Sequence, residues 1–106
     1  MQKYHKLVRD NIPDIIRSNG ERPVTRKLSA IEYKKELLKK LQEEAKEVFE
    51  AKGKLETVKE LSDVQEVLTA IYKAFDIARG DVTKMARKRR KERGAFTQKI
   101  FLERTE

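Results

Sequence analysis

The sequence predicts an all-α fold built on an antiparallel pair of long helices. Apolar residues recur at helical spacing over two segments, residues 30–52 and 55–79. Only a short connection around Gly53 separates the two segments, and short connections make antiparallel neighbours. Hydrophobic residues make up only 38% of the 106 residues, which is lean for a monomeric core. We therefore expect one domain, residues 1–106, in which smaller helices flank the pair and oligomerisation completes a four-helix-bundle core.

A short helix is expected near the start of the chain, from about Ile12 to Asn19. Asn11 is a good capping residue, and Pro13 falls in the first turn, where the missing N–H of proline costs nothing. Gly20 fits the helix end.

The first long helix should begin after Ser29, because Ser29 and Glu32 have the spacing of a capping box. We expect it to continue to about Lys52 and to end at Gly53. Its apolar stripe is formed by Leu37, Leu41, Ala45 and Val48, and it is widened by Leu38 and Phe49.

The second long helix is expected from about Leu55 to Arg79, with Gly80 as its stop and a basic fourth helix from a cap at Asp81 to Arg93. Gly94 would close the fourth helix. Short strands are possible at Val24–Leu28 and in the tail, where they could pair with each other. The apolar stripe of the second long helix contains Val58, Leu61, Val64, Leu68, Ile71 and Phe75.

The charge balance is strongly basic, with 26 Lys and Arg against 18 Asp and Glu, a net charge of +8. Residues 81–93 alone carry seven basic and two acidic side chains. A basic surplus favours polyanionic partners such as nucleotides or nucleic acid. There is no cysteine, and we find no apolar leader or membrane-length apolar run. We expect a soluble cytoplasmic protein without a membrane partner.

Two pairs of carboxylates interrupt the apolar faces of the long helices. Successive helical residues turn by about 100°, which places Glu44 about 60° from Leu41, inside the apolar arc, and Glu47 at its edge. On the next helix, Glu60 and Asp63 share a flank with Val67, Ala70 and Ala74. The four carboxylates are therefore expected to face inward.

An antiparallel pairing can bring the four carboxylates together, since residues three apart lie about 5–6 Å apart at Cβ. Carboxylates that converge in a half-buried place repel one another unless a cation lies among them. Oxygen ligands alone favour a hard ion, Mg²⁺ or, as a substitute, Mn²⁺. The alternative is ordinary solvated charge that balances nearby lysines.

These motifs resemble those of the MazG-like all-α nucleoside triphosphate pyrophosphatases. The pattern of that superfamily is EExxE, a gap and ExxD, which matches Glu43 to Glu47 and Glu60 to Asp63. The start YHKLVRDNIP and the tail ERGAF resemble a single-domain, phosphoribosyl-ATP pyrophosphohydrolase-like branch, in which KLVRDKIP and RGGF are usual. Asn11 and Ala95 depart from those forms.

The resemblance implies Mg²⁺-dependent hydrolysis of a nucleoside triphosphate between the α and β phosphates, giving a monophosphate and pyrophosphate. It implies metal ligation by Glu44, Glu47, Glu60 and Asp63, with Glu47 also a catalytic candidate. Glu43 is a candidate outer ligand or a base that orients the water. The nucleotide is left open, and phosphoribosyl-ATP is an alternative substrate. The expected assembly is a homodimer or homotetramer.

Basic residues supply candidates for phosphate contacts. Lys6 and Arg9 precede a helix start, where backbone amides favour anions. Lys88, Lys91 and Arg93 lie on the basic helix, close to the ERGAF turn. The alternative from another class is a non-enzymatic helical dimer that binds nucleic acid through Arg87–Arg93.

Overall fold

The computed structural model describes residues 4–106 and contains four helices and no strand within that range. The helices are α1 (Ile12–Ser18), α2 (Ala30–Glu50), α3 (Gly53–Ala74) and α4 (Arg79–Arg93). Contacts divide the chain into two units, one that ends at Asp76 and one that spans Ile77–Glu106. The all-α prediction is confirmed. The possible short strands at Val24–Leu28 and in the tail are wrong, because neither segment forms a strand in the described chain.

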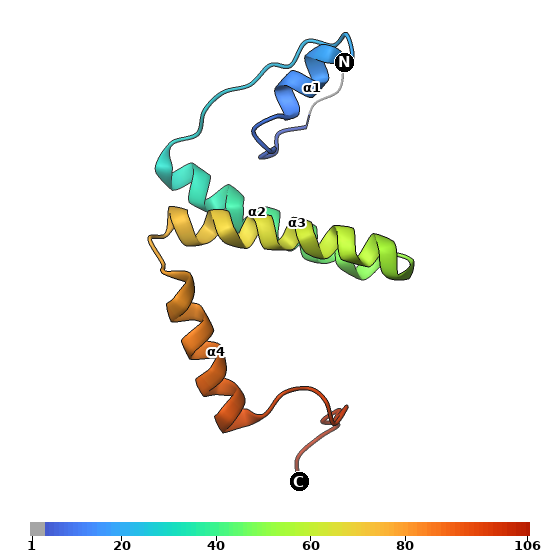
Figure 1. The fold of residues 1–106 in the computed structure, drawn as a ribbon, viewed down its shortest axis with the longest axis vertical. Coiled ribbons are helices and arrows are strands. Elements are labelled where there is room, and N and C mark those ends of the chain that lie inside the picture. Colours follow the sequence, from blue (N-terminus) through green and yellow to red (C-terminus); the bar gives the residue numbers. More distant parts are fainter. Residues whose placement is uncertain (1–3) are drawn as a thin grey trace. The chain divides into compact units, whose positions relative to one another are not determined.

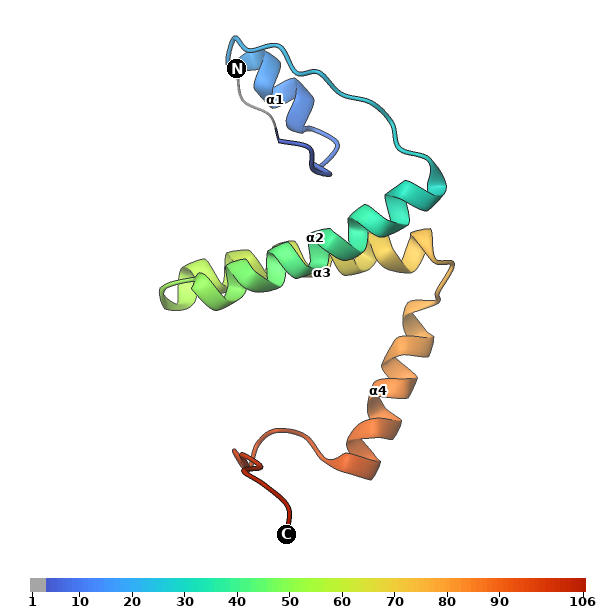
Figure 2. The same cartoon turned by 180° about the vertical axis from the view of Figure 1, so that it is seen from behind.

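Helices α2 and α3 form the predicted antiparallel hairpin and lie side by side in both views of the first unit (Figures 1 and 2). Only Ala51 and Lys52 connect them. Gly53 does not end α2, as the sequence suggested, but begins α3 with φ of 78°. That left-handed conformation strains residues with a Cβ, so the tight connection needs glycine at this position.

The start of α2 is fixed by the predicted capping box. The Ser29 Oγ accepts from the Glu32 N–H at 3.2 Å, and the Ser29 N–H donates to the Glu32 carboxylate at 3.3 Å. Arg26 also donates to that carboxylate, and together these contacts lower the pKa of Glu32 to about 2. Asn11 lies at the N-cap of α1, but it makes no side-chain cap hydrogen bond within the described chain.

The ends of the last two helices differ from the prediction. Helix α3 ends at Ala74 rather than Arg79. Asp76, which has φ of 55°, adopts a left-handed conformation that aspartate tolerates better than most residues, and the helix cannot continue through it. Gly80 therefore lies inside α4, and Asp81 lies in its first turn instead of capping it. Gly94 closes α4 as expected.

The hydrophobic core of the first unit is small and lies between α2 and α3. Leu37, Val67 and Ile71 are buried, and Leu7 from the N-terminal segment packs against them together with Leu41, Ala70 and Ala74. Val58 and Leu61, at the start of the predicted α3 stripe, are 55% and 50% exposed in the single chain. The flank that carries Val67, Ala70 and Ala74 makes the contact with α2 instead.

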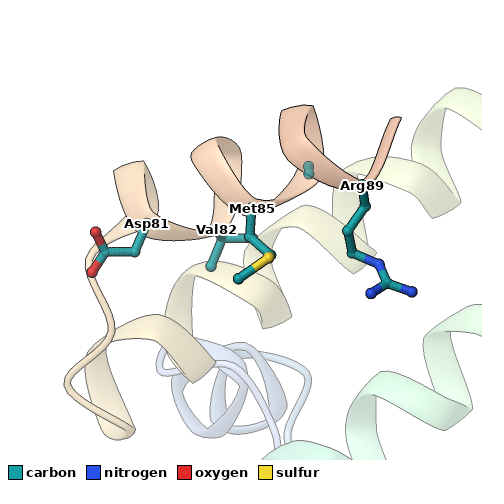
Figure 3. Close-up of a pocket in the computed structure, with 5 residues that line it drawn as sticks. Asp81, Val82, Met85 and Arg89 are labelled. Carbon is teal, nitrogen blue, oxygen red and sulfur yellow. The ribbon is translucent and has the colours of Figure 1, made fainter. Parts of the chain in front are cut away.

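Every residue of the second unit is exposed, including all of α4. Figure 3 shows Asp81, Val82, Met85 and Arg89 on α4, where with Ala86 they line a shallow hollow. No helix in residues 4–106 is long and apolar enough to cross a membrane. The prediction of a single domain stays a prediction.

The small core gives Leu37 a large share of the stability. We expect Leu37→Ala to lower the free energy of unfolding by about 2–5 kcal/mol, because it removes a buried side chain and leaves a cavity. Ile31→Ala is the matched control, since Ile31 lies on the same helix and is 83% exposed, and it should cost less than about 1 kcal/mol. Urea denaturation followed by circular dichroism measures both. Equal losses would show that the hairpin does not pack around Leu37.

Candidate metal centre

The hairpin brings the four predicted carboxylates together. One carboxylate oxygen from each of Glu44, Glu47, Glu60 and Asp63 can be chosen so that all four atoms lie within 4.8 Å of one another. Glu44 and Glu47 lie one helical turn apart on α2, as do Glu60 and Asp63 on α3. Because the helices run back past each other from a short connection, positions a few turns before it face positions a few turns after it.

Glu44 is the buried member of this carboxylate cluster. Its side chain is 9% exposed, and it follows Leu41 on the face of α2 that packs against α3, as its place in the apolar arc predicted. Glu47, Glu60 and Asp63 are partly exposed. The cluster therefore has a dry side at Glu44 and an open side that a solvated ligand can reach.

Burial, and after it the hydrogen bond and charge of Glu47, raise the pKa of Glu44 to about 7. The pKa of Glu60 is raised by the same two causes, burial first and Glu47 second. Each of these shifts has the sign expected when desolvated carboxyl groups share a site. Glu47 is the common neighbour that couples the two helices.

Two buried oxygens, Glu44 Oε2 and Glu60 Oε2, have no hydrogen-bond partner within the described residues when the carboxyls are ionised. A proton shared with Glu47 satisfies such an atom, and so does a bound cation. An unsatisfied buried oxygen is costly, so the cluster requires one of the two. This is the observation in the structure that favours a ligand over solvated surface charge.

The donor set fits a divalent cation. Opposite ligands of a Mg²⁺ ion lie about 4.2 Å apart and those of Ca²⁺ about 5 Å apart, twice the respective metal–oxygen distances. Four oxygens within 4.8 Å of one another match that spacing. The ligand chemistry, oxygen alone, indicates a hard cation.

Among the described residues, three cations flank the cluster, and sequence reasoning overlooked the role of Lys40. Its ammonium lies 3.7 Å from Glu44 Oε1 and 3.3 Å from Glu43 Oε2. Its side chain is 17% exposed, and its position four residues before Glu44 was the available signal. Arg9 Nη2 lies 2.8 Å from Asp63 Oδ1, and Lys59 Nζ lies 4.0 Å from Glu60 Oε1.

The other predicted site residues fall in different places. Glu43 is not in the carboxylate cluster, and it pairs with Lys40 and, at 3.9 Å, with Lys6. Lys6 and Arg9 therefore do reach acidic residues of the hairpin from the N-terminal segment. The remaining phosphate candidates are exposed residues of α4, in the second unit: Lys88, Lys91 and Arg93.

Comparisons with models of known protein families, with curated proteins and with solved structures found no match. The resemblance to MazG-like pyrophosphatases stays a prediction drawn from the sequence motifs. The inference of function below rests on the geometry and chemistry of the carboxylate cluster together with those motifs.

The raised pKa of Glu44 predicts a pH-dependent stability without metal. The folded-state pKa of about 7 exceeds the ordinary value of 4.5, so between these pH values the folded chain binds more protons than the unfolded chain. Stability from this group is therefore complete below pH 4.5 and is lost as the pH rises through about 7. The measurement is urea denaturation in EDTA across this range, for the wild type and Glu44→Gln.

We expect the stability of the wild type relative to Glu44→Gln to fall as the pH rises. Glu50→Gln changes an exposed carboxylate on the same helix and should leave the wild-type profile intact. Parallel profiles for the wild type and Glu44→Gln would contradict a desolvated carboxyl in the hairpin seam.

Proposed function

We propose that the protein is a metal-dependent nucleotide pyrophosphohydrolase that cleaves the α–β bond of a nucleoside triphosphate. The carrying observation is the inward-facing carboxylate cluster, in which two buried oxygens lack a partner in the described chain. The EExxE and ExxD motifs place the same four residues in the ligand positions of the family that the sequence resembles. A role in cleaning the nucleotide pool fits this activity, and phosphoribosyl-ATP is the alternative substrate.

In this proposal Glu44, Glu47, Glu60 and Asp63 hold the ion, with Mg²⁺ as the expected metal and Mn²⁺ as a substitute. A bound Mg²⁺ supplies charge neutralisation at the phosphates and an acidified water. Glu47 lies between the two helices' carboxyls, where it can orient that water or accept its proton. Glu43 lies outside the cluster and pairs with Lys40. In this proposal it contacts the ion only through a water molecule.

Phosphoryl transfer depends on positioning and electrostatics more than on a covalent nucleophile. Lys6 and Arg9 lie beside the hairpin's acidic residues and are the first candidates for contact with the phosphate chain. The exposed Lys88, Lys91 and Arg93 are proposed as further phosphate contacts. Arginine suits this task because its fork of donors matches a phosphate group.

Pyrophosphate release from a panel of nucleoside triphosphates, with Mg²⁺ and with EDTA, tests the activity. We expect metal-dependent release by the wild type and a loss of about 100-fold or more in Glu47→Gln, because a metal ligand and water-orienting group is removed. Glu50→Gln is the matched control, an exposed glutamate one turn further along α2. Circular dichroism should show folded protein in all three cases.

Full activity of folded Glu47→Gln would contradict the assignment of the site. If the wild type binds Mg²⁺ but releases pyrophosphate from none of the triphosphates, phosphoribosyl-ATP is the substrate to test next.

We also propose that a homo-oligomer completes the helical core. Each long helix carries a second apolar stripe that is exposed in the single chain. On α3 it comprises Leu55, Val58 and Leu61, which are 87%, 55% and 50% exposed, and on α2 it includes Leu38 and Phe49, at 47% and 89%. All of these except Leu55 belong to the apolar stripes predicted from the sequence, and a second copy of the hairpin would bury the whole set.

Light scattering on the purified chain tests the assembly. We expect a mass at least twice the 12.5 kDa of one chain, and dissociation when Val58 and Leu61 are both changed to Lys, because charge in an apolar interface is costly. The matched control places Lys at Thr83 and Thr97, both exposed residues of the second unit. A wild type that stays at 12.5 kDa would contradict the proposal.

A nucleic-acid-binding protein is the second candidate, and α4 is the observation that favours it. Eight basic residues and two acidic residues lie on this exposed helix. Binding of that kind weakens steeply with salt and ignores the carboxylates. This function would be favoured if Glu47→Gln and the wild type bind duplex DNA equally tightly and both lose affinity as salt is added. Neither protein should then release pyrophosphate.

A further inference from the structure

The N-terminal segment, residues 4–11, carries two cations to the acidic seam of the hairpin. Leu7 packs against the core formed by α2 and α3. On either side of Leu7 along the chain, Lys6 lies 3.9 Å from Glu43 and Arg9 lies 2.8 Å from Asp63. Nothing in the local sequence near Asp63 supplies this partner, since Arg9 precedes it by 54 residues.

The Arg9–Asp63 contact is of the kind that exchanges readily. The Arg9 side chain is 55% exposed and that of Asp63 is 29% exposed, so solvent screens the pair and it contributes little to stability. The hydrogen bond shown uses Nη2, whereas a guanidinium has five N–H donors in a planar fork. Donors therefore remain for an anion at the open side of the cluster.

Backbone contacts hold Arg9 in place while its side chain is exposed. The Ile12 N–H donates to the Arg9 carbonyl at 3.0 Å at the start of α1. Together with the packing of Leu7, this fixes the main chain on both sides of Arg9. The guanidinium can thus move between acceptors without a movement of the segment.

A divalent cation and Arg9 make competing demands on Asp63. A cation held by the cluster would lie close to the Asp63 carboxylate, and two positive charges a few ångströms apart repel each other. Lys40 is not free to move away from the cluster, because its side chain is only 17% exposed and pairs with both Glu43 and Glu44. The Arg9 side chain is 55% exposed, so it can move away from Asp63 into solvent.

We propose that Arg9 is an exchangeable counter-ion. It neutralises Asp63 while no divalent cation is bound, releases Asp63 when one binds, and then donates to the anionic oxygens of the polyphosphate chain that occupies the open side of the cluster. This inference rests on the proposed function, since it takes the same cluster as a metal site with a polyphosphate ligand. Arg9 would thereby favour a metal-bound polyphosphate over the metal alone.

The signature of exchange is a pair of opposite effects in one variant. In Arg9→Ala, Mn²⁺ alone should bind roughly two- to fivefold more tightly, because a weak competing ion pair is gone. Inorganic tripolyphosphate, in the presence of saturating Mn²⁺, should bind about tenfold or more weakly, because a charge-assisted contact is lost. A purely structural role would weaken both.

Isothermal titration calorimetry of the 106-residue chain measures both affinities. Arg17→Ala is the matched control, because Arg17 is similarly exposed and pairs with Asp14 at 2.6 Å within α1; it should match the wild type in both titrations. Arg9→Lys keeps the charge but not the fork, so it should keep wild-type Mn²⁺ affinity and lose part of the tripolyphosphate affinity. If Arg9→Ala fails to fold, the Arg9→Lys variant still tests the proposal through the tripolyphosphate titration.

The outcomes separate the two proposals when pyrophosphate release is measured on the same samples. Opposite effects in Arg9→Ala, without release from any triphosphate by the wild type, would support the exchange and overturn the hydrolysis of nucleoside triphosphates. Release by the wild type, with Arg9→Ala indistinguishable from Arg17→Ala in both titrations, would overturn the exchange alone. A wild type that binds no Mn²⁺ would overturn both.

Discussion

The burial of Glu44 in the seam between α2 and α3 is the constraint on which the rest of the structure depends. Its side chain is 9% exposed and has Glu47, Glu60 and Asp63 as neighbours. Burying one carboxylate among three others is unfavourable unless protons or a cation compensate. The helices can pack closely at this point only when the charge is compensated. Pairing of the hairpin and occupancy of the carboxylate cluster are therefore linked.

Because the hydrophobic core is small, the charge state of the carboxylate cluster has a large effect on the stability of the hairpin. Within the described chain the buried hydrophobic side chains are Leu37, Val67 and Ile71, and the carboxylate cluster lies directly beyond them along the same seam. A larger core would tolerate an uncompensated acidic cluster more easily, since stability is a small difference between large terms. Here the N-terminal segment adds Leu7 to the core and Arg9 to the cluster, so that one short segment supports both.

Local signals predicted much of this arrangement from the sequence. The capping box at Ser29, the short connection at Gly53 and the place of Glu44 in the apolar arc depend on near neighbours in the chain, and they were predicted. The flank of Val67 was expected to face inward, but the sequence left open which apolar stripe of α3 packs against α2, because only the partner helix decides between Leu61 and Val67. The Arg9–Asp63 pair is a tertiary contact without a local pattern.

The central claim is that the four carboxylates form one divalent-cation site. Anomalous diffraction from crystals of the 106-residue chain grown with Mn²⁺ tests it most directly. The account predicts a manganese peak bound by oxygens of Glu44, Glu47, Glu60 and Asp63, at the open side of the hairpin seam. A well-ordered hairpin without a manganese peak among these residues, or with the ion bound elsewhere, would contradict it.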